Sequence, residues 1–91
     1  MTDARPLYLL ATHPIEVAWD EPALTVEVPG AAAAFYPLPR VGRVISRGPV
    51  QWSGAALAGC LRHRVPVLFV ADDGHIQGVL SPLRQPPPDL S

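Results

Sequence analysis

Short stretches in which bulky apolar residues alternate with small or polar ones dominate the first half of the chain. This pattern runs over residues 15–19 and 24–28, and it is typical of a strand with one buried face. Apolar runs over 7–10 and 33–38 predict a strand on each side of this pair. Proline collects at strand ends because it has no N–H to donate, and here it separates the segments at positions 6, 14, 22, 29 and 37. The spacing predicts a small antiparallel β meander.

The second half of the chain predicts a different arrangement. Residues 41–46 indicate a strand, and Ser53 is a good N-cap for a helix over 54–64 because its hydroxyl can accept from a free backbone N–H. Residues 67–71 form an unbroken apolar run, which we expect of a strand covered on both faces. A returning strand follows over 75–80.

A strand, a helix and a second strand within about 30 residues make a crossover unit. The predicted fold class is therefore mainly β (α+β), with a small antiparallel meander and one β-α-β crossover that contains a single helix. On the helix, Leu57, Cys60 and Leu61 share an apolar face.

The chain also has fewer charged residues than an average domain. The chain has 91 residues, a net charge of −1 and only 16% charged residues, against roughly 25% in an average domain. A domain this short buries only about 60–65% of its unfolded surface. We therefore expect another surface to supply stability, from a partner copy or a missing remainder of the same chain. The near-neutral charge excludes a generally basic nucleic-acid coat.

Cysteine content and hydropathy exclude several further classes of protein. Cys60 is the only cysteine, so no disulfide forms within the chain, and the three histidines lack the spacing of a zinc site. No stretch approaches the roughly 18 apolar residues of a membrane span, and residues 1–6 are not a signal peptide. We expect a cytoplasmic protein without membrane association. Residues 1–82 are predicted to form one β domain, and residues 83–91 a proline-rich linker.

The arginines are the candidate residues for nucleic-acid binding, since arginine suits bidentate contact with phosphate. The alternative for the first three is a solvated strand edge, and for the other two it is capping of the helix end beside His63. The candidates are Arg40, Arg43, Arg47, Arg62 and Arg64.

Other reactive residues have plainer interpretations. Cys60 and His63 are three residues apart and could form a nucleophile and base, but a cysteine among alanines and leucines is more typical of a core. The pairs Asp20-Glu21 and Asp72-Asp73 could bind a metal. Neither pair has a third ligand at a suitable spacing, and each precedes proline or glycine, so we predict turns.

The order of these elements resembles a known family. Gly-Pro-Val-Gln-Trp-Ser at 48–53, Val-Pro-Val-Leu-Phe-Val at 65–70 and Asp-Asp-Gly at 72–74 are similar to the N-terminal β domain of the CRISPR-associated integrase of spacer acquisition (the Cas family numbered one). The similar stretch runs over 43–80. Residues 5–9 and 36–38 resemble the opening strand of that domain and its strand before the crossover, so the resemblance covers nearly the whole chain.

The resemblance implies a function for the complete protein, which in that family is a metal-dependent DNA integrase and nuclease working with a small CRISPR adaptation partner protein. Its metal ligands belong to a helical C-terminal domain that follows the linker. A divalent metal, Mg or Mn, is therefore expected only in that absent domain. No cofactor, catalytic residue or metal ligand is assigned to this chain, which alone is not expected to be an enzyme.

Three hypotheses follow from the residues and the resemblance. The leading one is a non-catalytic dimerisation and assembly domain of a CRISPR adaptation integrase, which forms a homodimer and helps to cradle DNA. The second is a stand-alone small nucleic-acid-binding protein that uses its arginines. The third is a small enzyme built on Cys60 and His63. For the first, the expected core or interface residues are Trp19, Val26, Val28, Phe35, Trp52, Leu57, Leu61, Val67 and Phe69.

Overall fold

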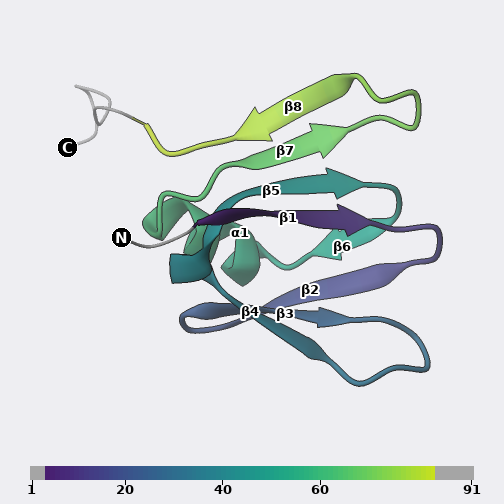
Figure 1. The fold of residues 1–91 in the computed structure, drawn as a ribbon, viewed down its shortest axis with the longest axis horizontal. Helices are drawn as coiled ribbons and strands as arrows, with labels where there is room; N and C mark the ends of the chain where they lie inside the picture. The colour runs from purple at the N-terminus through teal and green to yellow at the C-terminus, as the bar shows by residue number, and fades with distance from the viewer. Residues whose placement is uncertain (1–3, 84–91) are drawn as a thin grey trace.

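The computed structural model describes residues 4–83, which form eight strands, one α-helix and one short 3-10 helix (Figure 1). The strands make two four-stranded sheets. The first sheet has the order β1-β5-β7-β8, which can be followed upward in Figure 1 from β1 to β8, and the second sheet has the order β4-β3-β2-β6. The elements are β1 (Arg5–Leu10), β2 (Ile15–Asp20), β3 (Ala23–Glu27), β4 (Ala34–Pro37), the 3-10 helix η1 (Leu38–Arg40), β5 (Val41–Arg47), β6 (Val50–Trp52), α1 (Gly54–Arg62), β7 (Val67–Val70) and β8 (Ile76–Leu80).

The structure confirms the mainly β fold class and both of its predicted parts. Strands β2, β3 and β4 form an antiparallel meander. Strands β5 and β7 are parallel neighbours, and α1 lies between them in sequence, so the crossover is present. The expected returning strand, β8, pairs antiparallel with β7.

Two long-range features differ from the prediction. The first strand, β1, is not part of the meander but pairs in parallel with β5. A strand that was not predicted, β6, pairs in parallel with β2. Alternation of apolar residues shows which face of a strand is buried but carries no information about a partner far away in sequence, and the three residues of β6 are too few to give a pattern.

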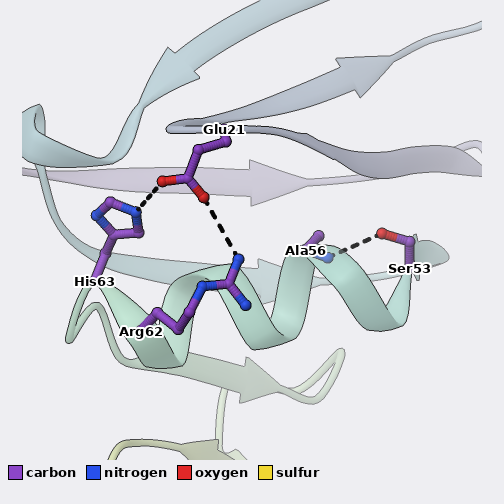
Figure 2. Close-up of polar contacts among 5 residues, drawn as sticks. All are labelled: Glu21, Ser53, Ala56, Arg62 and His63. Atoms are coloured by element: carbon purple, nitrogen blue, oxygen red, sulfur yellow. Dashed lines mark hydrogen bonds and ion pairs between the residues drawn. The ribbon is translucent and has the colours of Figure 1, made fainter.

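The helix begins at the expected cap but ends at Arg62 rather than at residue 64, and its buried face also differs from the prediction. The Ser53 side chain accepts a hydrogen bond from the Ala56 N–H at 3.0 Å (Figure 2). The buried helix residues are Ala56, Gly59 and Cys60, whereas Leu57 and Leu61 are half-buried. The small residues allow α1 to approach the second sheet closely.

Gly59 shows how close this approach is. A methyl group at Gly59 would lie 2.6 Å from ring carbons of Trp19 on β2, well inside van der Waals contact. The indole of Trp19 therefore rests directly on the helix backbone, and residue 59 has to be glycine for the packing to persist.

The core lies between the two sheets and the helix. Its largest fully buried side chains include Val17 and Leu24 of the second sheet and Val44 and Val67 of the first. One buried polar group joins the sheets: the Trp52 Nε1–H donates to the Ser46 hydroxyl at 3.1 Å. The Trp52 ring also makes an edge contact with Phe69, with centroids 6.4 Å apart.

The chain crosses from the first sheet to the second in two connections that lie next to each other. The β1–β2 connection begins at Ala11, and the β5–β6 connection contains Gly48. The Ala11 N–H donates to the Arg47 carbonyl at 2.9 Å. Gly48 has φ +84°, and a side chain there would overlap the Ala11 carbonyl oxygen. Glycine at 48 is thus required both by the backbone conformation and by the neighbouring chain.

Candidate interaction surface

One face of the first sheet is apolar, and no element among residues 4–83 forms a layer over it. Its central row crosses all four strands, because Tyr8 pairs with Ile45, Ile45 with Leu68, and Leu68 with Val79. We call these four residues the apolar row. Tyr8 is 58% exposed and Val79 56% exposed at the two ends, while Ile45 and Leu68 between them are half-buried.

A second row lies next to the first on the same face. It contains Leu10, Arg47, Val70 and Ile76, which are neighbours across the same four strands. Leu10 and Ile76 are exposed, and none of the apolar side chains in either row packs in the buried core. We call the two rows together, with Arg43 beside them, the outer face of the first sheet.

This face corrects the expectation for residues 67–71. We expected a strand covered on both faces, but only the side of β7 that carries Val67 and Phe69 packs against the core. Leu68 and Val70 point to the other side, where no element among residues 4–83 covers them. The sequence of β7 is therefore typical of a strand covered on both faces, but residues 4–83 cover only one face of it.

The two sheets also carry opposite charges. The strands of the first sheet contain Arg5, Arg43 and Arg47 and no acidic residue. The strands of the second sheet contain three acidic residues, Glu16, Asp20 and Glu27, and no basic residue. The near-zero net charge of the chain therefore conceals a separation of charge between the sheets.

The outer face of the second sheet is polar. Glu16 and Glu27 lie directly opposite each other on neighbouring strands, a pairing of like charges that only an exposed position tolerates. Thr25 pairs with Phe35 on the same sheet, and Phe35 is 59% exposed. Apart from this phenylalanine, the face suits contact with water.

The five candidate arginines lie in three places rather than in one cluster. Arg43 and Arg47 are on the outer face of the first sheet, and the Arg47 guanidinium donates to the Asp72 carbonyl. Arg40 is the last residue of η1. Arg62 ends the helix and Arg64 follows it in a left-handed conformation, φ 58°.

At the helix end, side chains join α1 to the β2–β3 turn (Figure 2). Glu21 contacts His63 Nε2 at 3.2 Å and Arg62 at 3.5 Å. The Arg62 guanidinium also lies 5.7 Å from the centre of the Trp19 ring. The hydrogen bond from His63, with the nearby Arg62 charge, lowers the pKa of the Glu21 carboxyl. The Arg62 and His63 side chains therefore join the helix end to the β2–β3 turn through Glu21, and the capping of the helix carbonyls stays a prediction.

Cys60 is a core residue. Its side chain is fully buried, and burial raises the pKa of the thiol to about 11. The thiolate that a nucleophile needs is therefore not available at neutral pH. His63 is engaged with Glu21 rather than with the thiol.

Asp72-Asp73 lies in a turn, as predicted, while Asp20 is the last residue of β2 and Glu21 begins the β2–β3 turn. Gly74, with φ +96°, closes the β7–β8 turn after Asp72-Asp73. The backbone N–H of His75 donates to Asp73 at 3.1 Å, and this bond lowers the pKa of the Asp73 carboxyl. Among residues 4–83, no three His, Cys, Asp or Glu side chains are placed to hold a metal ion.

The remaining expected core or interface residues divide by position. Val26 and Val67 are buried, and Trp19, Trp52 and Phe69 are half-buried and pack against the core. Leu57 and Leu61 are half-buried, while Val28 and Phe35 are exposed. Sequence reasoning missed the apolar row. Its signal was present in residues 7–10, where the positions on both sides of the strand are apolar.

No helix in the described part of the chain is long and apolar enough to cross a membrane. The predicted linker at 83–91 lies, apart from Leu83, outside the described residues.

Comparison with known proteins gives one consistent family. The sequence model of the family described as CRISPR associated protein Cas1 matches residues 8–88. No curated protein matches the chain significantly. Among solved structures, a CAS1 protein from Thermotoga maritima is similar with a TM-score of 0.76 and 17% identity, over 90% of this chain and 25% of that one.

Two further structures are similar in fold. One is a chain of a Cas6-RT-Cas1–Cas2 complex, with a TM-score of 0.79 and 20% identity over 94% of this chain and 9% of that one. The other is a Cas1 protein in complex with DNA, with a TM-score of 0.71 and 13% identity over 85% of this chain and 26% of that one. This chain therefore spans about a quarter or less of the length of each.

Proposed function

Because the chain belongs to the Cas1 family of CRISPR-associated proteins, and its fold is that of one part of much longer relatives, we propose that it is an N-terminal assembly domain of a CRISPR adaptation integrase. The role proposed is self-association into a homodimer, which supports the insertion of captured DNA by the complete protein. A cytoplasmic location, where that DNA lies, is part of the same proposal.

The domain is non-catalytic in this proposal. Catalysis and its divalent metal belong to a helical domain outside this chain, and the described residues offer no ligand set for a metal. The small adaptation partner protein and DNA are proposed partners of the complete assembly; similar structures include a Cas1–Cas2 complex and a Cas1–DNA complex.

The observation that supports self-association is the uncovered outer face of the first sheet. Its four strands lie about 4.8 Å apart and five residues extend about 17 Å, so the face covers on the order of 250 Å² before side-chain relief is counted. A patch of this size lies just below the largest apolar patches of ordinary soluble monomers, about 300–600 Å², which are often functional. The low fraction of charged residues, 16%, agrees with a surface that is covered in use.

Sedimentation velocity of the 91-residue chain, across the micromolar range and in moderate salt, tests the proposal. We expect a species of twice the 9.7 kDa monomer mass whose fraction rises with concentration. A single 9.7 kDa species at every concentration contradicts self-association.

A second candidate function is DNA binding by this domain through its arginines. The separation of charge supports it, since the strands of the first sheet carry Arg5, Arg43 and Arg47 without any acidic residue. Binding of duplex or branched DNA, measured by fluorescence anisotropy, should then weaken steeply as salt is raised. The Arg43→Gln variant should lower the slope of that dependence by about one phosphate contact. No anisotropy change at low salt would reject this candidate.

A further inference from the structure

A cavity of about 290 Å³ lies where the start of β1, the end of β4 and the start of β5 meet. Its lining includes the apolar side chains of Leu7 and Val41, the ring of Tyr36, and two arginines, Arg5 and Arg40. We infer that this cavity is a docking site for an acidic segment of a partner protein. An apolar side chain of that segment enters the cavity, and neighbouring carboxylates of the segment pair with the two arginines.

An irregularity in the first sheet places one of these arginines. The register of the β1–β5 ladder shifts between Arg5 and Pro6, which leaves Gly42 of β5 without a partner on β1. Such bulges redirect side chains and are common beside functional sites. Arg5 and Leu7 both line the cavity, and Leu7 packs against the core. The cavity therefore lies on the side of β1 opposite to Tyr8, so a partner on the outer face of the first sheet would use the other side of this strand.

The two arginines carry positive charge that the described residues do not neutralise. Within residues 4–83, neither Arg5 nor Arg40 forms an ion pair with an acidic side chain. The residues that line the cavity include no aspartate or glutamate. Arginine binds carboxylates through two parallel hydrogen bonds, and these charge-assisted bonds are stronger than neutral ones. Charge complementarity therefore favours an acidic occupant.

The size and lining of the cavity indicate an apolar side chain rather than a bound cofactor. Pockets that enclose a small-molecule ligand have about 300–1,000 Å³, and this cavity of about 290 Å³ is smaller than that range. Leu7 and Tyr36 are half-buried, so each keeps apolar surface that a partner can cover. Tyrosine and arginine are also enriched among the residues that contribute most to protein interfaces.

Two prolines determine how the segment can bind. Pro6 of β1 and Pro37 of β4 both line the cavity. Proline has no N–H, so at these positions neither strand can donate a hydrogen bond to an added strand. We therefore expect the segment to be held by its side chains, through the apolar anchor and the carboxylates, and not by extension of either sheet.

The same features argue against a nucleic acid as the occupant. Most contacts to a duplex are made by donors and cations directed at phosphates along an extended backbone. Arg5 and Arg40 instead stand beside a confined apolar lining, which a phosphate would leave without a matching partner. Arg43 and Arg47, the other arginines of the first sheet, lie on its outer face and do not line the cavity.

An NMR titration of the ¹⁵N-labelled 91-residue chain tests the site. The probes are three capped hexapeptides, Gly-Glu-Asp-X-Glu-Gly, with leucine, phenylalanine or tryptophan at X. We expect at least one of them to shift the amide signals of Arg5, Leu7 and Arg40. Replacing X by glycine should weaken binding about tenfold, because the apolar anchor is lost.

Variants of the arginines separate the ionic contacts from the apolar one. Arg5→Gln and Arg40→Gln should each raise the dissociation constant of the peptide about threefold, and the double variant about tenfold. Arg64→Gln is the matched control, because it removes the same charge from a residue that does not line the cavity. It should change the dissociation constant by less than about twofold, and circular dichroism verifies that each variant folds.

The remaining outcomes decide against the inference. No shift at these amides with any of the three peptides at millimolar concentration overturns the site. Equal binding of peptides whose carboxylates are replaced by amides overturns the role of the arginines. A single-stranded oligonucleotide that shifts the same amides more strongly than the peptides overturns the choice of occupant. Asp3 lies outside the described residues, and binding that appears only in Asp3→Asn would show that the chain's own carboxylate holds the arginines, which also overturns the inference.

Discussion

The two sheets of this domain differ in the residues that they carry on their outer faces. The second sheet has one apolar face and one polar face, and its outer surface carries Glu16, Thr25 and Glu27 toward water. The first sheet has apolar rows on both faces, although the described residues cover only one of them and Arg43 and Arg47 interrupt the other.

The difference shows that the first sheet has more apolar residues than the core of the domain buries. The core uses Leu9, Val44 and Val67 from the first sheet. It leaves Tyr8, Leu10 and Val79 outside. Because the two sets alternate along the same sheet, burial of the inner set in the core does not explain the outer set, and the outer surface supports the proposed self-association.

The largest expected effect comes from breaking the connection between the sheets. In Gly48→Ala, the new methyl group overlaps the Ala11 carbonyl in a left-handed backbone conformation. We expect the free energy of unfolding to fall by about 3 kcal/mol, measured by urea denaturation. Gly30→Ala is the control, since Gly30 also has a positive φ, +81°, but has nothing within 4 Å. It should cost only about 1 kcal/mol, and an equal loss in both variants would contradict the importance of the Ala11 contact.

The next largest effect is expected where the helix packs against the second sheet. Gly59→Ala pushes a methyl group against the Trp19 ring, which sits 2.6 Å from the new atom, and we expect a loss of about 1–3 kcal/mol. Gly54→Ala, in the same helix, has nothing within 4 Å of the new methyl. That control should be neutral or slightly stabilising because alanine favours helix. A Gly59→Ala protein as stable as Gly54→Ala would show that helix and sheet do not pack this closely.

A smaller effect is expected at the hydrogen bond between the sheets. Trp52→Phe leaves the buried Ser46 hydroxyl without its indole donor, and we expect a loss of about 1–2 kcal/mol. Adding Ser46→Ala to this variant removes the unpaired hydroxyl and should recover part of the loss. Urea denaturation of the four proteins in this cycle measures the coupling, and simple additivity would contradict the bond.

The smallest effect concerns Glu21 at the helix end. Its carboxyl pKa is lowered by the hydrogen bond from His63, so the charged form is favoured by folding and its contribution is present at neutral pH. As the pH falls through that lowered pKa, the carboxylate gains a proton and the contribution is lost. Glu21→Gln should therefore lower the urea midpoint slightly at pH 7, and the difference from wild type should vanish in acid. Asp20→Asn, beside it, is the control, and a difference that persists at low pH would contradict this cause.

Local elements were predictable from sequence because their signals are local. The cap at Ser53, the turn before Gly74 and the alternation over 15–19 each depend on neighbouring residues, and each matches the structure. The close contact between Gly59 and Trp19 joins two distant segments. A glycine inside a helix was its sequence signal, since glycine there is unfavourable without a packing reason.

The division into two sheets could not be predicted for a similar reason. Nothing in the apolar run over 7–10 distinguishes β2 from β5 as its neighbour, and the structure pairs Tyr8 with Ile45 on β5. The uncovered face could not be predicted for the same reason. An all-apolar strand has the same sequence whether its second layer comes from its own chain or from another one.

The parallel pairing of β1 with β5 has a consequence for how the domain folds. These strands are separated in sequence by the whole meander, so the first sheet needs the closure of a long loop before its β1–β5 contacts form. Strands β2, β3 and β4 need only short turns between neighbours. We expect the meander to form early, so that the second sheet acts as the template on which the first is assembled.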